Sequence, residues 1–279
     1  MAISLIPHSA MFWAFMLTLL AGLSTAFGAF LAFFKSKDES TILAFGLGFS
    51  GGVMVYLSFV EILPKSIDFF SRINATNAES LGILCFFVGM ILAFGIDLLI
   101  PKDVNPHELK SQNEVYCELE SREAHISRNN AIKRTAIFTA IAITIHNFPE
   151  GFATFISALD SVAFGVSIAV AVAIHNIPEG LAVSLPIYHA TGDKRQALKL
   201  TLLSGLSEPL GAIVGYFLLA PILGEATLAI SFGIIAGIMV FIALDSLLPN
   251  SKLSTKGHES VCGVFCGMGI MAVSLLILK

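Results

Sequence analysis

Long apolar runs, separated by short polar stretches, follow one another along almost the whole chain. Each run approaches the roughly 20 apolar residues that a helix needs to cross the hydrocarbon core of a bilayer. We expect eight membrane-spanning helices, over residues 9–34, 41–64, 80–100, 133–156, 161–187, 197–220, 227–248 and 259–278. The pattern therefore predicts an all-α polytopic membrane protein, with one transmembrane domain over residues 1–279 and the lipid bilayer as its surroundings.

The composition supports this assignment. The chain is 56% hydrophobic and 13% charged, with a mean hydropathy of +0.84, whereas soluble domains carry roughly 25% charged residues. The four cysteines lie in predicted spans or in a loop, and their positions indicate no disulfide framework. The net charge of −4 is less informative than the distribution of the charges, and no nucleic-acid partner is expected.

The basic residues favour one side of the membrane. Of the 16 lysines and arginines, all but Lys65, Arg72 and Lys279 fall in or beside the loops after the first, third, fifth and seventh spans. Cytoplasmic loops carry the excess of basic residues in membrane proteins. We therefore expect a multi-pass protein of the cell membrane, with both termini outside and the polar loop 101–132 in the cytoplasm.

Several spans repeat one another. Leu17–Ala29 in the first span and Leu200–Ala212 in the sixth are identical at nine of thirteen positions. Gly52–Pro64 in the second span aligns without a gap with Gly237–Pro249 in the seventh, and the third and eighth spans match weakly. Spans that are five crossings apart run in opposite senses. The sequence therefore predicts an inverted-topology repeat of spans 1–3 and 6–8, the plan of many secondary transporters with mid-membrane binding sites.

One hexapeptide occurs twice, in the predicted fourth and fifth spans. It reads His-Asn-Phe-Pro-Glu-Gly at 146–151 and His-Asn-Ile-Pro-Glu-Gly at 175–180. In each copy the imidazole and the carboxylate are four residues apart and so share a helix face. The proline has no amide hydrogen, which leaves a backbone carbonyl without its helical partner. The fourth and fifth spans are thus related to each other, and each carries the donor atoms of a metal site inside apolar sequence.

The two copies are expected to meet near mid-membrane. Their histidines lie about thirteen and fourteen residues into spans that enter from opposite faces, roughly 20 Å deep at about 1.5 Å per residue. Glu208, in the sixth span, reaches a similar depth and stands where the repeat has Thr25. Carboxylates at this depth are costly unless they are paired or bind a cation. The candidate metal ligands are His146, Asn147, Glu150, His175, Asn176, Glu179 and Glu208.

These donors are nitrogen and oxygen atoms without thiolate, which suits divalent ions of the first transition row such as Zn²⁺, Fe²⁺, Mn²⁺ and Co²⁺. Such ions would be transported substrates, and no cofactor is expected. The ligands outnumber the four that one zinc ion usually takes, so we hypothesise two adjacent ions bridged by Glu150 and Glu179. The alternative is that these groups only hydrogen-bond one another and hold the helices together.

The donor set favours a transporter that exposes a mid-membrane metal site alternately to each side. An ion-coupled transporter of another small solute, with the polar centre as its ion site, stays open as an alternative, as does a receptor that binds metal without flux. An enzyme is not expected. Membrane metalloproteases use His-Glu-x-x-His with the glutamate as base, whereas asparagine follows each histidine here.

The chain resembles the ZIP (Zrt/Irt-like) divalent metal transporters, and within them the bacterial ZupT-type zinc transporters. The resemblance rests on the paired hexapeptide and on the segments Lys133–Ile137, Ala169–Val183, Ala190–Arg195 and Ser204–Glu208. It implies import of zinc and other divalent cations into the cytoplasm through a binuclear centre with the seven ligands named above. It also implies that spans 1, 4, 5 and 6 move as a transport unit against spans 2, 3, 7 and 8, along which homodimers form.

Two positions depart from the family pattern. Ser246 stands where the branch often has a second acid after Asp245, which leaves a role of the seventh span in metal release open. Pro209 follows Glu208 where the branch has another apolar residue, and a proline at that point predicts an altered local bend.

Overall fold

All regular structure in the described part of the chain is helical. The computed structural model describes residues 8–33, 39–98, 140–141, 143–145, 147–219, 224–253 and 257–278. Its α-helices are α1 (His8–Leu31), α2 (Glu39–Leu57), α3 (Leu63–Ile73), α4 (Ala78–Leu98), α7 (Val162–Thr191), α8 (Lys194–Gly205), α9 (Ser207–Leu219), α10 (Glu225–Ile242), α11 (Leu248–Leu253) and α12 (Glu259–Leu278). Residues 147–160 are also helical. The π-helical turns η2 (Ser58–Ile62) and η4 (Ala243–Leu247) join α2 to α3 and α10 to α11.

Seven helical stretches within these ranges are long and apolar enough to cross a membrane. They are Ser9–Leu31, Thr41–Ile73, Ala78–Leu98, Val162–Leu185, Lys194–Phe217, Glu225–Lys252 and Glu259–Ile277. The prediction of an all-helical protein that crosses the membrane several times is thereby confirmed for the described residues. Of the predicted fourth span, 133–156, residues 133–139, 142 and 146 lie outside them, and the total of eight spans stays a prediction.

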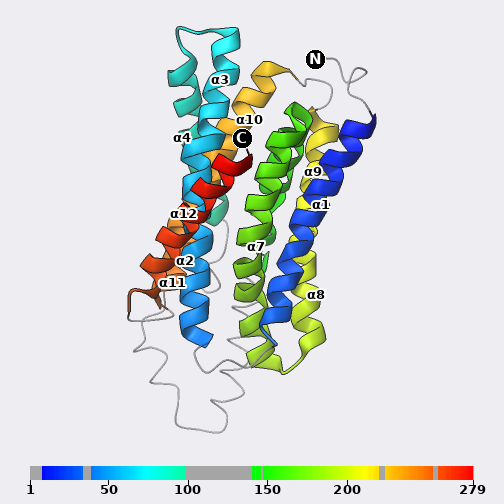
Figure 1. Ribbon diagram of the computed structural model, residues 1–279, viewed down its shortest axis with the longest axis vertical. Coiled ribbons are helices and arrows are strands. Elements are labelled where there is room, and N and C mark those ends of the chain that lie inside the picture. Colours follow the sequence, from blue (N-terminus) through cyan, green and yellow to red (C-terminus); the bar gives the residue numbers. More distant parts are fainter. Residues whose placement is uncertain are drawn as a thin grey trace.

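The helices form two groups that stand side by side (Figure 1). In one group, α1 packs against α7, α8 and α9, and in the other α2 packs against α12 while α10 packs against α3 and α4. Contacts between α2 and α7 join the two groups. Exposed apolar side chains such as Ile91 on α4 and Leu276 on α12 cover the outward faces. Such a surface suits lipid, because the hydrocarbon core offers no water to polar groups.

Two helical runs continue through prolines beyond the predicted ends of their spans. The predicted second span stops at Pro64, but the helical run reaches Ile73 by way of η2 and α3. Pro64 lacks an amide hydrogen, so a regular turn cannot bond the carbonyl four residues earlier. The chain widens instead into a π-turn, in which the amide of Leu63 bonds Ser58 O. The same turn precedes Pro249 in η4, and π-turns of this kind are frequent at functional sites.

The sixth predicted span, 197–220, is interrupted at Leu206 between α8 and α9. Pro209, three positions after this residue, removes the amide that would bond Gly205 O in a continuous helix. The interruption agrees with the bend expected from this proline. It places Glu208 in the first turn of α9.

An ion pair links the two groups at the end of the molecule where α3 turns into α4. Lys65 Nζ of α3 lies 2.7 Å from Asp160 Oδ2 and 4.5 Å from the centre of the Phe164 ring on α7. Both charged side chains are about one-fifth exposed (23% and 20%). A pair with this exposure is worth roughly 0–1 kcal/mol, so packing and not this pair must hold the groups together.

Candidate metal centre

The two hexapeptides lie on two neighbouring helical segments. Asn147 to Gly151 belong to the helix of residues 147–160, while His146 lies outside the described residues. The second copy lies in the middle of α7, which runs unbroken through Pro178. Because the second copy is helical, its histidine and glutamate project from one face, as their spacing predicts.

Three donor groups from the two helices converge at one point. His175 Nε2 lies 2.7 Å from Glu150 Oε1. One donor atom each from Glu150, His175 and Glu179 can be chosen so that all three atoms lie within 4.8 Å of one another. All three side chains are buried, with at most 1% of their surface exposed. Two atoms bound to one zinc ion lie at most about 4.4 Å apart, because zinc–oxygen and zinc–nitrogen bonds are about 2.0–2.2 Å long, so these three groups could hold one ion with at most a small shift of their side chains.

The two asparagines of the hexapeptides bond to neighbouring helices, and Asn176 also contacts Glu208. Asn176 Nδ2 donates to Glu208 Oε1 and, at 2.9 Å, to Ala21 O on α1. Asn147 Nδ2 donates to Ser204 O on α8 at 3.3 Å. Because each asparagine NH₂ group points to these acceptors, the Oδ1 atom of the same side chain points away from them. The two Oδ1 atoms and Glu208 Oε2 are buried and have no hydrogen-bond partner in the described part of the chain.

Buried oxygen atoms without a donor are rare in folded proteins, because each leaves a desolvation cost of roughly 1–3 kcal/mol uncompensated. The costs are larger for carboxylates, and Glu150, Glu179 and Glu208 are all buried. A bound dication would satisfy such oxygens and offset the repulsion between the carboxylates. The structure thus brings Glu150, His175 and Glu179 together, pairs Asn176 with Glu208, buries Asn147 and leaves His146 undescribed.

One contact at this centre was not predicted from the sequence. Ser50 of α2, which is fully buried, donates its hydroxyl to Glu179 Oε1 at 3.0 Å. A single serine in a glycine-rich apolar span is a weak signal, and recognising the contact requires knowing that α2 packs against α7. Ser50 therefore adds a hydroxyl from the other helix group to the set of residues around the metal centre.

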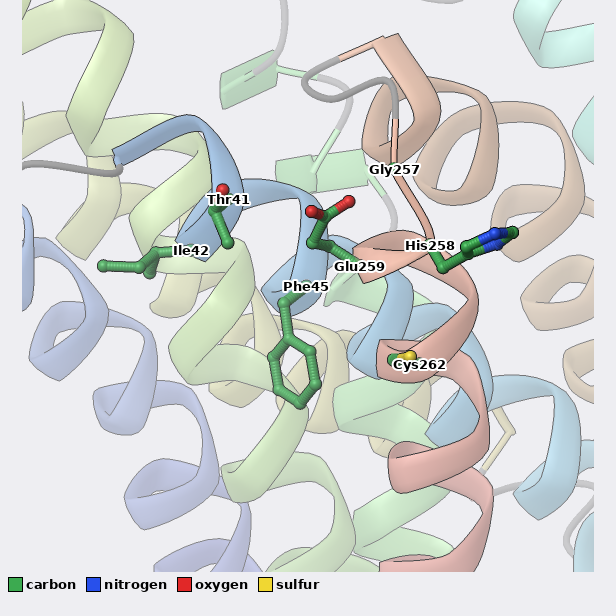
Figure 2. Close-up of a pocket in the computed structure, with 7 residues that line it drawn as sticks. All are labelled: Thr41, Ile42, Phe45, Gly257, His258, Glu259 and Cys262. Atoms are coloured by element: carbon green, nitrogen blue, oxygen red, sulfur yellow. The ribbon is translucent and has the colours of Figure 1, made fainter.

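A surface hollow of about 670 Å³ lies elsewhere, between the beginnings of α2 and α12 (Figure 2). It is lined by Thr41, Ile42, Phe45, Gly257, His258, Glu259 and Cys262. His258 and Cys262 are metal-ligand types, but Figure 2 shows the imidazole directed away from the thiol and from the Glu259 carboxylate. These residues do not converge as those of the buried centre do.

Known proteins resemble the chain over nearly its full length. The family model described as ZIP zinc transporter matches residues 100–275. A protein named zinc transporter ZupT from Campylobacter jejuni subsp. jejuni is 56% identical, with 96% of this chain and 97% of the relative covered. Proteins with the same name from Clostridium perfringens and Streptococcus mutans are 46% and 48% identical, over 95% and 96% of this chain and 95% and 98% of the relatives.

These matches confirm the resemblance stated from the paired hexapeptide. They also confirm that the chain is a transporter and not an enzyme, with metal as transported substrate and not as a cofactor. The family model covers both hexapeptides and Glu208. The chain belongs to the ZIP zinc transporter family.

Proposed function

We propose that this protein imports zinc across the cell membrane by exposing the buried metal centre alternately to each side. The observation that carries the proposal is the convergence of Glu150, His175 and Glu179 from two helices, with donor atoms within 4.8 Å of one another. Their nitrogen and oxygen donors extend the range of cargo to Fe²⁺, Mn²⁺ and Co²⁺. The relatives named as zinc transporters support zinc as the main cargo.

The test is uptake of radiolabelled Zn²⁺, Fe²⁺ and Mn²⁺ into proteoliposomes that contain the purified protein. We expect saturable zinc uptake well above that of protein-free vesicles. Absence of metal flux would contradict the proposal, and so would flux of an organic solute that needs no divalent ion. A pH gradient across the vesicles shows in addition whether protons affect the rate.

The centre is proposed to hold two ions. Glu150, His175 and Glu179 form one group of donors, and Asn147, Asn176 and Glu208 are the proposed ligands of a second ion next to it. One zinc ion usually takes four protein ligands, so the set is too large for a single ion. Glu150 and Glu179 would bridge the two positions.

This arrangement predicts that purified protein, equilibrated with saturating zinc, binds two ions per chain. Mass spectrometry under native conditions, or elemental analysis after dialysis, measures the ratio. A variant with Asn147, Asn176 and Glu208 all replaced by alanine is expected to fall to one ion. A ratio that never exceeds one in the unmodified protein would contradict the binuclear hypothesis.

An inverted repeat is proposed to build this centre, and backbone contacts support it. A Cβ atom on Gly28 of α1 would collide with Ile177 O, and a Cβ atom on Gly211 of α9 would collide with Phe148 O. Gly28 and Gly211 are partners in the alignment of Leu17–Ala29 with Leu200–Ala212. Phe148 and Ile177 occupy the same place in the two hexapeptides. Each half of the repeat thus packs against the other hexapeptide helix in the same way.

The asparagines follow the same relation. Asn147 donates to Ser204 O and Asn176 donates to Ala21 O, and these two acceptors are again repeat partners. In the second and seventh spans, η2 and η4 begin at aligned residues, Ser58 and Ala243. Equivalent contacts at equivalent positions are what a pseudo-two-fold axis through the centre requires.

The proposed topology has eight spans and both termini outside. α1 begins and α12 ends toward the same end of the molecule, and the start of α8, with Lys194 and Arg195, lies at the opposite end (Figure 1). The positive-inside rule assigns that opposite end to the cytoplasm. The helix of residues 147–160 would complete the fourth span.

The two helix groups suit a moving unit and a stationary one. The metal donors lie on α7, on α9 and on the helix of residues 147–160, within or beside the group that contains α1 and α8. We propose that this group carries the ions past the group of α2, α3, α4, α10 and α12. The exposed apolar faces of α4 and α12 are the proposed contact of a homodimer.

A further inference from the structure

We propose that Ser50 is a positioning residue for metal binding, which orients the Glu179 carboxylate from the neighbouring helix group. The inference deepens the proposed function, on which it rests. It is carried by the hydrogen bond from Ser50 Oγ to Glu179 Oε1, at 3.0 Å, between two fully buried side chains.

The direction of this hydroxyl is unusual within the described helices. Buried serines and threonines in a helix commonly donate to the carbonyl four residues earlier in the same helix. Several hydroxyls here do so, namely those of Thr18, Ser58, Ser157, Ser184 and Thr201. The Ser50 hydroxyl instead leaves its own helix and bonds a side chain 129 residues away in sequence. Its orientation is therefore set by Glu179.

The packing of α2 against α7 brings the two residues within reach. One turn before Ser50, a Cβ atom on Gly46 would lie 3.3 Å from Pro178 Cβ, so the helices approach closely beside the second hexapeptide. A short side chain such as serine is then long enough to reach Glu179. In the alignment of the second and seventh spans, Ser50 stands opposite Ile235. Ser50 is therefore more polar than its repeat partner, as Glu208 is more polar than Thr25, and both residues lie at the level of the metal centre.

The hydroxyl of Ser50 is better suited to orient the Glu179 carboxylate than to bind the metal ion itself. The usual protein ligands of zinc are thiolate, imidazole and carboxylate, and a neutral serine is not among them. A donor that holds one oxygen of a ligating carboxylate fixes its rotation, and losing such a partner typically weakens metal affinity about 10–100-fold. Because Ser50 and Glu179 lie in different helix groups, the bond also couples the orientation of the ligand to the relative position of the groups.

The experiment compares zinc uptake by Ser50→Ala, Ser50→Thr and the unmodified protein in proteoliposomes. We expect Ser50→Ala to raise KM about 10-fold and to change the maximal rate much less. Ser50→Thr keeps the hydroxyl and should restore KM. The matched control is Ser58→Ala, which removes an equally buried hydroxyl from the same helical run but one that bonds Met54 O. Its KM should stay near that of the unmodified protein.

A double-mutant cycle on zinc binding to purified protein separates positioning from a general packing defect. Ser50→Ala should weaken binding in the unmodified background and have little effect when Glu179 is already alanine, because the hydroxyl then has no carboxylate to orient. Equal losses in both backgrounds, or an unchanged KM in Ser50→Ala, would overturn the inference. Such a result leaves zinc transport by the unmodified protein intact, whereas absence of that transport refutes the proposed function itself.

Discussion

Replacement of Glu179 by glutamine is expected to reduce zinc uptake to the background of protein-free vesicles, a loss of about 100-fold or more. Loss of an outer hydrogen-bond partner of a ligand already costs about 10–100-fold in affinity, and this change removes the charge of the ligand itself. Glu179 is fully buried and lies with Glu150 and His175 in one group of donors. Glutamine keeps the size of the side chain, so the helix packing around it should survive.

The control for this substitution is Glu79→Gln, the same chemical change at an exposed position in the first turn of α4. It should leave uptake unchanged. Both variants should reach the membrane in normal amounts, measured by quantitative immunoblotting of the membrane fraction. Normal uptake by Glu179→Gln would remove this carboxylate from the metal centre and with it the main support for the proposed function.

The second large effect is expected from Gly180→Ala, which should both destabilise the protein and abolish uptake. A Cβ atom at this position would collide with the backbone carbonyl of Thr25 on α1. A backbone group cannot turn aside as a flexible side chain does, so α1 and α7 must separate. Overpacking costs about 1–3 kcal/mol. The separation would also displace Glu179, the neighbouring residue.

The loss of stability is measured by heating the protein in detergent and determining by size-exclusion chromatography how much folded protein remains at each temperature. Gly95→Ala is the matched control, since a Cβ atom there meets nothing within 4 Å. Alanine favours a helix over glycine by about 1 kcal/mol, so the control should not lower the unfolding temperature. An unfolding temperature and an uptake rate unchanged in Gly180→Ala would contradict the close contact of α1 with α7.

The convergence of the donors followed from local features of the sequence. A spacing of four residues places His175 and Glu179 on one face of any helix, and the apolar surroundings place that helix in the membrane. The duplicated hexapeptide then indicated that two such faces meet. These arguments use only helix periodicity and burial, which do not depend on how the other helices pack.

Other features depend on packing and were not predictable. The helical run through Pro64 needs a π-turn, and whether a proline ends a helix or widens it depends on what lies beyond it. The hydrogen bond of Ser50 depends on which helix lies against α2. The asparagine amides point to carbonyls of α1 and α8 that no spacing relates to the hexapeptides.

The most direct test of the metal centre is anomalous X-ray diffraction at the zinc absorption edge, from crystals of the protein grown with zinc. The account predicts an anomalous peak about 2.0–2.2 Å from donor atoms of Glu150, His175 and Glu179. The account is contradicted if the protein transports zinc and the anomalous peak appears only at another place, such as the hollow beside His258 and Cys262.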